Sequence, residues 1–344
     1  MNGAPVRVAV LREEADWEAI AEEWNGLLRR SVSDVPFLRF DFLRAWWATL
    51  GGGEWPDGSL WIVTGRSEQG ELRGAAPLFR TSAHPESLLL LGTHEVADYL
   101  DVLAAPQDVT DFARVLLHTI EDLAPPGVKV LDLWNILEDS PSTAAFSRAA
   151  AEAGWAVRRQ QLKPSPRVSL EGGWEAYLAR LDKKQRHELR RKMRRAAEPQ
   201  EGTTITRASA GARLSESVEA FLTLMNLDGA KAGFLTPPMR RMFHLLTSAA
   251  AAGGWLRLEF LNVGEAVAAG AYCFDYADRL WLFNSGLDPR YRSLSPGWAL
   301  IGHLIRSAAE EGKVEVDFLR GDEDYKYRLG GVARYVERIT LTRP

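Results

Sequence analysis

Residues 280–300 read LWLFNSGLDPRYRSLSPGWAL, an apolar stretch followed by a basic loop and a second apolar stretch. The first part has the composition of a strand, and the last has apolar residues at helical spacing. Ser295 and Pro296 indicate a helix start, since Ser is favoured at the N-cap and Pro at the first helical position. A strand, a helix and a further strand predict a parallel crossover of an α/β unit. The expected strand, loop, helix and second strand are 280–285, 286–295, 296–310 and 314–319.

The start of this helix is suited to binding an anion. Backbone N–H groups at a helix N-terminus lack intrahelical partners, and the helix dipole is positive there. Arg290 and Arg292 in the preceding loop would add charge-assisted hydrogen bonds to a phosphate. The competing interpretation is a structural helix with solvated arginines, and Pro296 removes one N–H group that a phosphate would use. The residues alone leave both interpretations open.

The surrounding segments predict two units of similar plan. Turns at 262–264 and 276–278 join three strands into an antiparallel meander ahead of the crossover. In the first half, a meander is followed by a strand, a helix and a neighbouring strand. The Pro-containing segment 163–166 then gives two domains, 1–165 and 166–344. Further expected elements are strands 6–11, 128–134, 155–161, 202–207 and 335–342, and helices 141–153, 174–197, 215–229 and 237–252.

Composition excludes several classes of protein. Hydrophobic residues make up 46% and charged residues 26%, as in a globular protein, and the net charge of −4 does not suit a general DNA-binding protein. The single cysteine, Cys273, excludes an internal disulfide and is expected to be buried. No metal site is expected, because the six histidines lack metal-ligand spacing. Without a signal peptide or a membrane-length apolar run, we expect a cytoplasmic protein, with peripheral membrane association left open.

A polar cluster follows the second crossover strand. Residues 314–328 read VEVDFLRGDEDYKYR, at the strand end where α/β units usually bind ligands. Asp317 would accept a proton from an attacking amine, and Tyr325 would donate one to a leaving group. Arg320 or Lys326 would stabilise an oxyanion or hold a phosphate. The alternative is an exposed polar loop with weak surface ion pairs.

The segment 180–195 is a strongly basic helix. It carries nine basic residues against two acidic ones, an excess of seven positive charges, around an apolar stripe. One interpretation is a solvated helix whose charges surround a core-facing stripe. The other is docking of an anion, such as the phosphates of coenzyme A, a phosphosugar, an anionic lipid headgroup or tRNA.

These stretches together resemble known acyltransferases. Residues 292–297 resemble the pyrophosphate-binding loop of GNAT acyltransferases, with Ser295 at the usual first glycine. The second half is similar to the CelD-like branch of GNAT acetyltransferases, which is related to Fem-type aminoacyl transferases. The matching stretches are 255–258, 267–269, 286–289, 295–297, 317–321 and 325–326.

The resemblance implies an α/β fold with mixed α+β sheets, built from tandem GNAT-like units. Each unit is expected to be a mostly antiparallel sheet with one parallel strand–helix–strand crossover, flanked by helices. The first unit would be degenerate, and the second would carry the active site. The implied site residues are Asp317, Tyr325 and Lys326 for catalysis, Arg290, Arg292, Ser295 and Gly297 for acyl-CoA, and Asp98, Tyr99, Arg320, Lys183 and Arg186 for the substrate.

We therefore expect an N-acyltransferase that moves an acyl group from acetyl-CoA or another acyl-CoA to an amine. The acceptor would be a small molecule or a phosphorylated sugar, such as an amino sugar or a precursor of the cell envelope or exopolysaccharide, as the CelD-like relatives suggest. Two alternatives stay open. The donor could be aminoacyl-tRNA, as in Fem-type enzymes, or the protein could be a non-catalytic binder of an acidic glycan or lipid precursor. A His-x-x-x-Asp match at 94–98 is set aside, because five-residue matches arise easily by chance.

Overall fold

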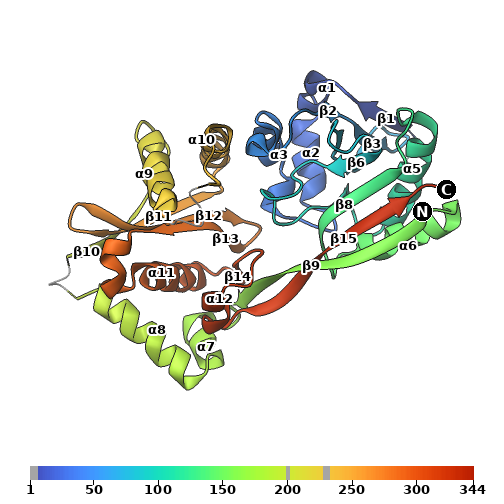
Figure 1. Ribbon diagram of the computed structural model, residues 1–344. Coiled ribbons are helices and arrows are strands. Elements are labelled where there is room, and N and C mark those ends of the chain that lie inside the picture. Colours follow the sequence, from blue (N-terminus) through green and yellow to red (C-terminus); the bar gives the residue numbers. More distant parts are fainter. Residues whose placement is uncertain (1–6, 199–201, 228–232) are drawn as a thin grey trace. The chain divides into compact units, whose positions relative to one another are not determined.

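The computed structural model describes residues 7–198, 202–227 and 233–344, so residue 6 of the first expected strand and residues 228–229 of an expected helix lie outside it. The chain forms two compact units: unit 1 is Met1–Lys163 with Tyr335–Pro344, and unit 2 is Pro164–Arg334. It passes from unit 1 into unit 2 within β9 (Ala156–Ser169) and returns within β15 (Val332–Thr342), as Figure 1 shows. The fold is α/β, with sheets that combine parallel and antiparallel strands.

The last ten residues differ from the sequence prediction. The expected second domain ran to residue 344, whereas Tyr335–Pro344 belongs to unit 1. The cause is a long-range strand pairing, because β15 runs antiparallel to β8 (Val130–Leu137) from Val336 to Thr342. The other end of the predicted boundary lies two residues from the observed division.

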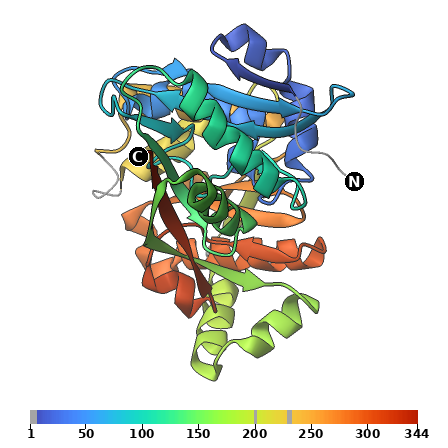
Figure 2. The same cartoon turned by 90° about the vertical axis from the view of Figure 1, so that its right-hand side faces the viewer.

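Unit 1 holds a small sheet in the order β1-β3-β4-β7 and a second run of strands in the order β15-β8-β6-β5-β2. Its core is rich in tryptophan: Trp17, Trp24, Trp46 and Trp61 are almost fully buried. Figure 2 shows α5 and α6, which pack against each other. The strands are β1 Arg7–Leu11, β2 Ser59–Leu60, β3 Ile62–Arg66, β4 Leu72–Ala76, β5 Leu78–Arg80, β6 Ser87–Leu90 and β7 Leu103–Ala104. The helices are α1 Glu14–Glu18, α2 Ala21–Leu28, η1 Pro36–Leu38, α3 Phe40–Trp47, α4 Leu50–Gly53, α5 Val109–Leu123 and α6 Pro141–Ala153.

The parallel crossover of unit 1 is not the one predicted. Strands 128–134 and 155–161, with helix 141–153 between them, were expected to be neighbours. Instead β8 lies between β6, its parallel partner, and β15. The crossover therefore runs β6–α5–β8, because β15 takes the edge of β8 that β9 was expected to fill.

Unit 2 has the strand order β10-β11-β12-β13-β14-β9, with helices on both faces (Figure 1). Helices α9 and α10 cover one face, and α11 packs on the other face together with α7 and α8. The strands are β10 Thr203–Arg207, β11 Leu256–Val263, β12 Ala266–Tyr276, β13 Arg279–Leu287 and β14 Glu315–Asp317. The helices are α7 Gly173–Arg180, α8 Lys183–Ala196, α9 Leu214–Asn226, α10 Pro237–Ala252, η3 Pro289–Leu294, α11 Pro296–Glu310 and α12 Asp324–Arg328. In the described part of the chain, no helix is both long and apolar enough to cross a membrane.

Two details of unit 2 decide the geometry of the site. The helix predicted over 174–197 is broken after Arg180, because the side chain of Asp182 accepts a hydrogen bond from the Gln185 N–H and so caps a new helix, α8. The helix predicted over 296–310 is confirmed as α11. Before it, β13 pairs with β14 in parallel only from Arg279 to Trp281, and then continues to Leu287 without that partner. The two strands therefore separate beside the start of α11.

Candidate functional site

The start of α11 has an unusual backbone. Ser295 precedes the helix with φ 52° and ψ 51°, the left-handed conformation that favours glycine. Its N–H donates to the carbonyl of Arg292 at 3.0 Å, and its side chain does not cap the helix, which differs from the predicted Ser cap. The first turn of α11 contains no acidic side chain. The N–H groups of Gly297 and Trp298 remain available to an anion, since first-turn N–H groups have no intrahelical acceptor.

A cavity of about 400 Å³ lies at this helix start, and we call it the first cavity. Arg292, Ser295 and Gly297 line it, as does Trp298 on the next position of the helix. Ser285 and Leu287 line it from the part of β13 that β14 no longer covers, and Lys192, Ile301, Tyr325 and Leu329 complete the wall. The sequence-predicted loop residues Arg292, Ser295 and Gly297 thus come together at one opening.

Two cations lie over Trp298 at the edge of the first cavity. The ammonium of Lys192 is 3.8 Å from the centroid of the ring, and the guanidinium carbon of Arg328 is 5.0 Å from it. Glu188 holds both, at 3.0 Å from Lys192 and 2.6 Å from Arg328. The hydrogen bond from Arg328 is the main reason that the pKa of Glu188 lies below its usual value. The Glu188 carboxylate therefore holds the two cations in place at the edge of the first cavity.

Arg290 lies apart from Arg292. Its exposed guanidinium makes hydrogen bonds of 2.6 to 3.1 Å with both carboxylate oxygens of Asp288. These bonds lower the pKa of the Asp288 carboxyl. Arg290 is not among the residues that line the first cavity, so a ligand there would meet Arg292 and Lys192 instead.

Tyr325 is one of the residues that line the first cavity. It belongs to α12, which directly follows the turn after β14, and its ring packs edge-on to Phe318 with centroids 6.2 Å apart. Burial raises the pKa of Tyr325, so the hydroxyl keeps its proton well above pH 10. Its chemistry in this position is that of a hydrogen-bond donor.

Asp317 and Lys326 have other surroundings than the sequence prediction assigned to them. Asp317 is fully buried; one carboxylate oxygen is 2.6 Å from Arg334 and the other accepts a hydrogen bond from the Leu319 N–H. The ammonium of Lys326 donates to the carbonyls of Leu319 and Arg320 and is 2.9 Å from Glu323. Neither residue is among those that line the first cavity. Both hold the turn that places α12.

The remaining predicted substrate residues lie elsewhere. Tyr99 is buried in unit 1 with its ring 5.9 Å from that of Phe37, and Asp98 belongs to the same unit. Lys183 is exposed at the first position of α8. Arg186 donates to the Leu178 carbonyl at 3.3 Å. Of the predicted substrate residues in unit 2, Lys183, Arg186 and Arg320 are not among those that line the first cavity.

Two further observations concern reactive groups. Cys273 is fully buried, as predicted, and burial raises the pKa of its thiol, so it does not serve as a nucleophile. Within residues 7–198, 202–227 and 233–344, no group of three or more His, Cys, Asp or Glu side chains is arranged to hold a metal ion.

Sequence reasoning missed two residues of the first cavity. Lys192 belongs to the basic helix and was given no role of its own, although its position four residues after Glu188 indicates an intrahelical ion pair. Trp298 directly follows Gly297 in the first helical turn, where an aromatic ring is close to whatever the helix start binds. Which cations reach this ring depends on how α8 and α12 pack against α11, and local sequence patterns do not predict that packing.

Comparison with known proteins finds a family model that matches part of unit 2. Residues 183–327, all in unit 2, match the model of an acetyltransferase (GNAT) domain. No curated protein matches the sequence. The structure of FemX aligns over 93% of this chain and 95% of that chain, with a TM-score of 0.69 at 12% identity. The structure of L-PGS from Bacillus licheniformis aligns over 94% and 91%, with a TM-score of 0.58 at 13% identity.

A tandem GNAT protein from the clavulanic acid biosynthesis pathway is also similar. It aligns over 98% of this chain and 99% of that chain, with a TM-score of 0.51 at 13% identity. At such low identities the three structures share their fold with this chain. The alignments extend over both units, whereas the family model matches unit 2 alone.

Proposed function

Because residues 183–327 form a GNAT acetyltransferase domain, the chain belongs to the GNAT superfamily, and we propose that it transfers an acyl group from acyl-CoA to an amine at the first cavity. The observation that carries this proposal is the start of α11 beside the separated strands β13 and β14. There, Arg292, Lys192 and Tyr325 line one opening at the start of the helix.

The residues at the helix start fit the phosphates of the donor. The N–H groups of Gly297 and Trp298 would donate to them at the positive end of the helix dipole. Arg292 would add a charge-assisted hydrogen bond. Ser295 adopts the left-handed backbone that glycine usually takes, so its presence does not change the course of the loop. The first turn lacks an acidic residue that would repel the phosphates.

Tyr325 is the proposed catalytic residue. Bound acyl-CoA supplies the thioester carbon that the amine attacks, and the carbon–sulfur bond then breaks. The Tyr325 hydroxyl, kept protonated by burial, would donate its proton to the departing sulfur. The tyrosinate left behind would take up the proton that the amine nitrogen loses as the amide forms, so Tyr325 returns to its starting state. Asp317 and Lys326 would act as positioning residues, because they hold the turn between β14 and α12. We propose an amino sugar as the acceptor class, on the resemblance to CelD-like proteins alone.

Replacing Gly297 tests this proposal. A Cβ added at Gly297 would lie 3.6 Å from the nearest side-chain atom, an ordinary contact, so the position accepts a side chain. Gly297→Asp places a negative charge in the first turn, which favours the helix but repels a phosphate. Gly297→Asn has the same shape without the charge and is the matched control.

The measurement is calorimetric titration with acetyl-CoA and with coenzyme A. Relative to Gly297→Asn, Gly297→Asp is expected to weaken binding about tenfold or more, because one buried charge contact is worth about 1.5–3 kcal/mol. Its melting temperature is expected to be equal or higher. No binding of either compound to the unchanged protein would refute the proposal, and so would equal affinities of the two variants.

A second candidate function has aminoacyl-tRNA as the donor. One side of α8 presents only basic residues: Lys183, Lys184, His187, Arg190, Arg191, Arg194 and Arg195. On a helix of 3.6 residues per turn they cover an arc of about 140°. Except for Arg190, which is 3.0 Å from Glu175, these cations have no acidic partner among the described residues. The fold similarity to FemX gives this candidate a reason as well.

Salt dependence distinguishes the two donors. With tRNA as the donor, affinity for unacylated tRNA should fall at least tenfold between 50 and about 200 mM salt. The Lys183→Glu/Lys184→Glu variant should weaken tRNA binding and leave coenzyme A binding unchanged. If tRNA does not bind at low salt, the second candidate is wrong.

A further inference from the structure

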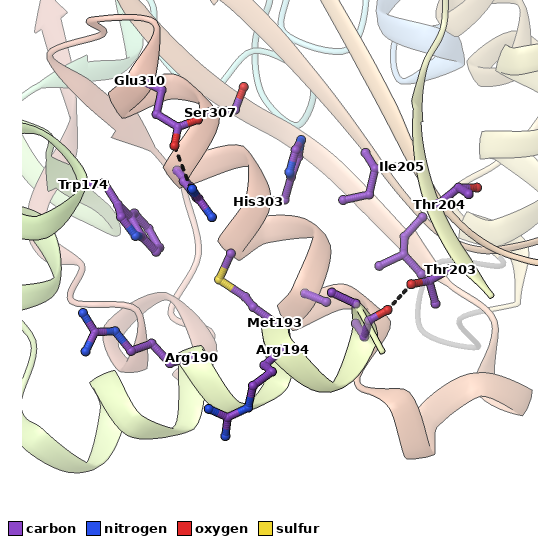
Figure 3. A pocket seen from close by; sticks show the side chains of 15 residues that line it. Trp174, Arg190, Met193, Arg194, Thr203, Thr204, Ile205, His303, Ser307 and Glu310 are labelled. Carbon is purple, nitrogen blue, oxygen red and sulfur yellow. Dashed lines mark hydrogen bonds and ion pairs between the residues drawn. The ribbon is translucent and has the colours of Figure 1, made fainter. Parts of the chain in front are cut away.

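Unit 2 contains a second cavity of about 690 Å³, which Figure 3 shows from close by. It lies between α7, α8, α11 and the strands β10 and β11. From α11 it is lined by Ala299, His303, Arg306, Ser307 and Glu310, whereas Gly297, Trp298 and Ile301 face the first cavity. At about 100° per residue these two sets lie on opposite sides of the helix. The second cavity is thus a separate site, and a ligand bound there is independent of the proposed acyl transfer.

The floor of the second cavity is apolar. Trp174 of α7 and Met193 of α8 lie along it, together with Leu261 of β11 and Ala299 of α11. All four belong to the hydrophobic core of unit 2 or pack against it. Figure 3 shows Met193 projecting from α8 toward the space in front of α11. This surface suits a hydrocarbon segment, because burying apolar area is favourable at about 25 cal/mol per Å².

The rim of the second cavity is positive. Three arginines line it, Arg190, Arg194 and Arg306, against a single carboxylate, Glu310. Arg306 pairs with Glu310 at 2.8 Å, and Arg190 pairs with Glu175, whose side chain is 77% exposed, so that pair is weak. Arg194 is exposed and has no ion-pair partner among the described residues. Figure 3 shows Arg190 and Arg194 on the same stretch of α8, one turn apart.

Polar side chains that already interact with other protein groups line the inner part of the second cavity. His303 is half-buried, with its Nε2 atom 3.6 Å from the buried Glu259 carboxylate, and Ser307 donates to Glu311 at 2.8 Å. Both are committed to a network with the buried Arg257. The charged groups that can meet a ligand are therefore at the rim, while the interior offers mainly carbon.

We propose that the second cavity binds an anionic amphiphile, with its charged end at Arg190 and Arg194 and its hydrocarbon part over Met193 and Trp174. A bare anion would leave the apolar floor unused, and a neutral hydrocarbon would leave the unpaired Arg194 without a counter-charge. The volume lies in the range of small-molecule sites, about 300–1,000 Å³. A fatty carboxylate and an alkyl phosphate share this chemistry.

Calorimetric titration with decanoate and with decyl phosphate, both kept below their micelle-forming concentrations, tests the proposal and distinguishes these two sources. We expect at least one of them to bind with a defined stoichiometry of one. Arg194→Glu is expected to weaken that binding about tenfold or more, because it replaces an attraction by a repulsion. Arg195→Glu is the matched control, since Arg195 is the next residue, equally exposed, and does not line the cavity.

Four results would overturn the proposal. The first is equal weakening by Arg194→Glu and Arg195→Glu, which would mean general attraction to the basic helix. The second is equally tight binding of inorganic phosphate or of octyl glucoside, which would leave only an anion site or only an apolar site. The third is competition with coenzyme A, which would place the ligand in the first cavity. The fourth is no binding of either amphiphile to the unchanged protein.

A variant that fills part of the second cavity with a larger side chain tests the proposal without changing any charge. Ala197 lines the second cavity and is exposed at the end of α8, so Ala197→Phe is expected to fill space without disturbing the core. It should weaken binding of the amphiphile and leave the affinity for coenzyme A within about twofold, with circular dichroism confirming the fold. Unchanged binding of the amphiphile would also contradict the proposal.

Discussion

The chain has a parallel crossover in each unit, β6–α5–β8 in unit 1 and β13–α11–β14 in unit 2. The two crossovers differ in the charge of the residues at the start of their helix. Helix α5 begins with two acids, Asp108 before it and Asp111 in its first turn, and Arg73 is 3.5 Å from Asp108. Helix α11 begins without an acidic residue, behind a left-handed Ser295. An anion would be repelled at the first start and attracted at the second. This difference supports unit 2 as the unit that binds the donor.

The second strands of the two crossovers, in contrast, share a feature: each carries an aspartate that pairs with an arginine. Asp317 in β14 pairs with Arg334 at 2.6 Å, and Asp132 in β8 pairs with Arg338 at 2.7 Å, both arginines coming from β15. A buried aspartate–arginine pair therefore occurs in each unit, with or without a helix start that suits a donor. Because such a pair occurs in both units, it supports a structural role for Asp317. The difference between the two helix starts concerns the binding of the donor instead.

The largest expected effect concerns this shared pair. Asp317→Ala removes the carboxylate that is 2.6 Å from Arg334, whose side chain is 12% exposed, and we expect a loss of about 3–5 kcal/mol in the free energy of unfolding. Asp132→Ala should cost less, about 1–3 kcal/mol, because Arg338 is 33% exposed and regains water. Urea unfolding followed by tryptophan fluorescence measures both.

Asp317→Asn separates stability from chemistry. This variant keeps the shape of the side chain, so enough of it should fold for titration with acetyl-CoA. A structural role predicts that Asp317→Asn lowers stability and that the folded fraction binds acetyl-CoA normally. Full stability combined with loss of acyl transfer would contradict that role and restore Asp317 as a candidate base.

The second prediction concerns chemistry that only unit 2 should have. Tyr325→Phe removes the hydroxyl of a residue that lines the first cavity and keeps the ring that packs on Phe318. We expect kcat to fall about 100-fold, the size of a lost general-acid contribution, with little change in acetyl-CoA affinity. Thiol release from acetyl-CoA with glucosamine as the acceptor is the measurement. An unchanged kcat would exclude Tyr325 as the acid.

A pH profile adds to this test. Because burial raises the pKa of Tyr325, its proton is retained as the pH rises past 10, so the unchanged enzyme should not lose activity through this group between pH 7 and about 9.5. A fall in kcat within that interval that is absent from Tyr325→Phe would mean that the hydroxyl titrates there.

Local signals in the sequence predicted the elements that depend on neighbouring residues. Ser295 and Pro296 predicted the start of α11, and Gly312 predicted its end, because caps are properties of a short segment. The break after Arg180 was missed, although Asp182 was a recognisable cap, because the apolar stripe continues through it. The pairing of β15 with β8 was beyond such reasoning, since its partners are separated by some 200 residues.

In the candidate site, too, the sequence predicted what depends on neighbouring residues and missed what depends on the tertiary fold. Arg292, Ser295 and Gly297 follow one another in the chain, and the structure brings them to one cavity. Asp317 was assigned a proton-transfer role from its position on a strand, but its burial and its contact with Arg334 depend on the tertiary fold. The contacts of Trp298 with its two cations depend on the packing of α8 and α12 against α11, which no local pattern encodes.

The third prediction compares helix starts in the two units. Ser295→Gly relieves a left-handed φ and should raise the free energy of unfolding by about 0.5–1 kcal/mol, after the entropy of the unfolded glycine is included. Ser140→Gly is the matched change before α6, where φ is −68° and the side chain caps the helix. It should lower stability by about 1 kcal/mol or more, mainly because it also removes the hydrogen bond that the Ser140 hydroxyl donates to the buried Asp101 at 2.6 Å. Loss of the cap to glycine adds about a few tenths of a kcal/mol. Urea unfolding of both variants tests this, and stabilisation of neither by glycine would contradict the conformational argument.

The smallest expected effect concerns the cations over Trp298, which have no equivalent in the acidic start of α5. The pKa of Glu188 is lowered in the folded protein, mainly by Arg328, so its contribution to stability is present above about pH 4.5 and is lost as the pH falls through the lowered value. Glu188→Gln should therefore reduce stability at pH 7 by about 1 kcal/mol or less, since the pair is partly exposed, and the difference should shrink as the pH falls below about 4.5. Urea unfolding of both proteins at several pH values from 2.5 to 7 gives the comparison. Parallel curves over that interval would mean that Glu188 is not the group that holds Lys192 and Arg328 at the start of α11.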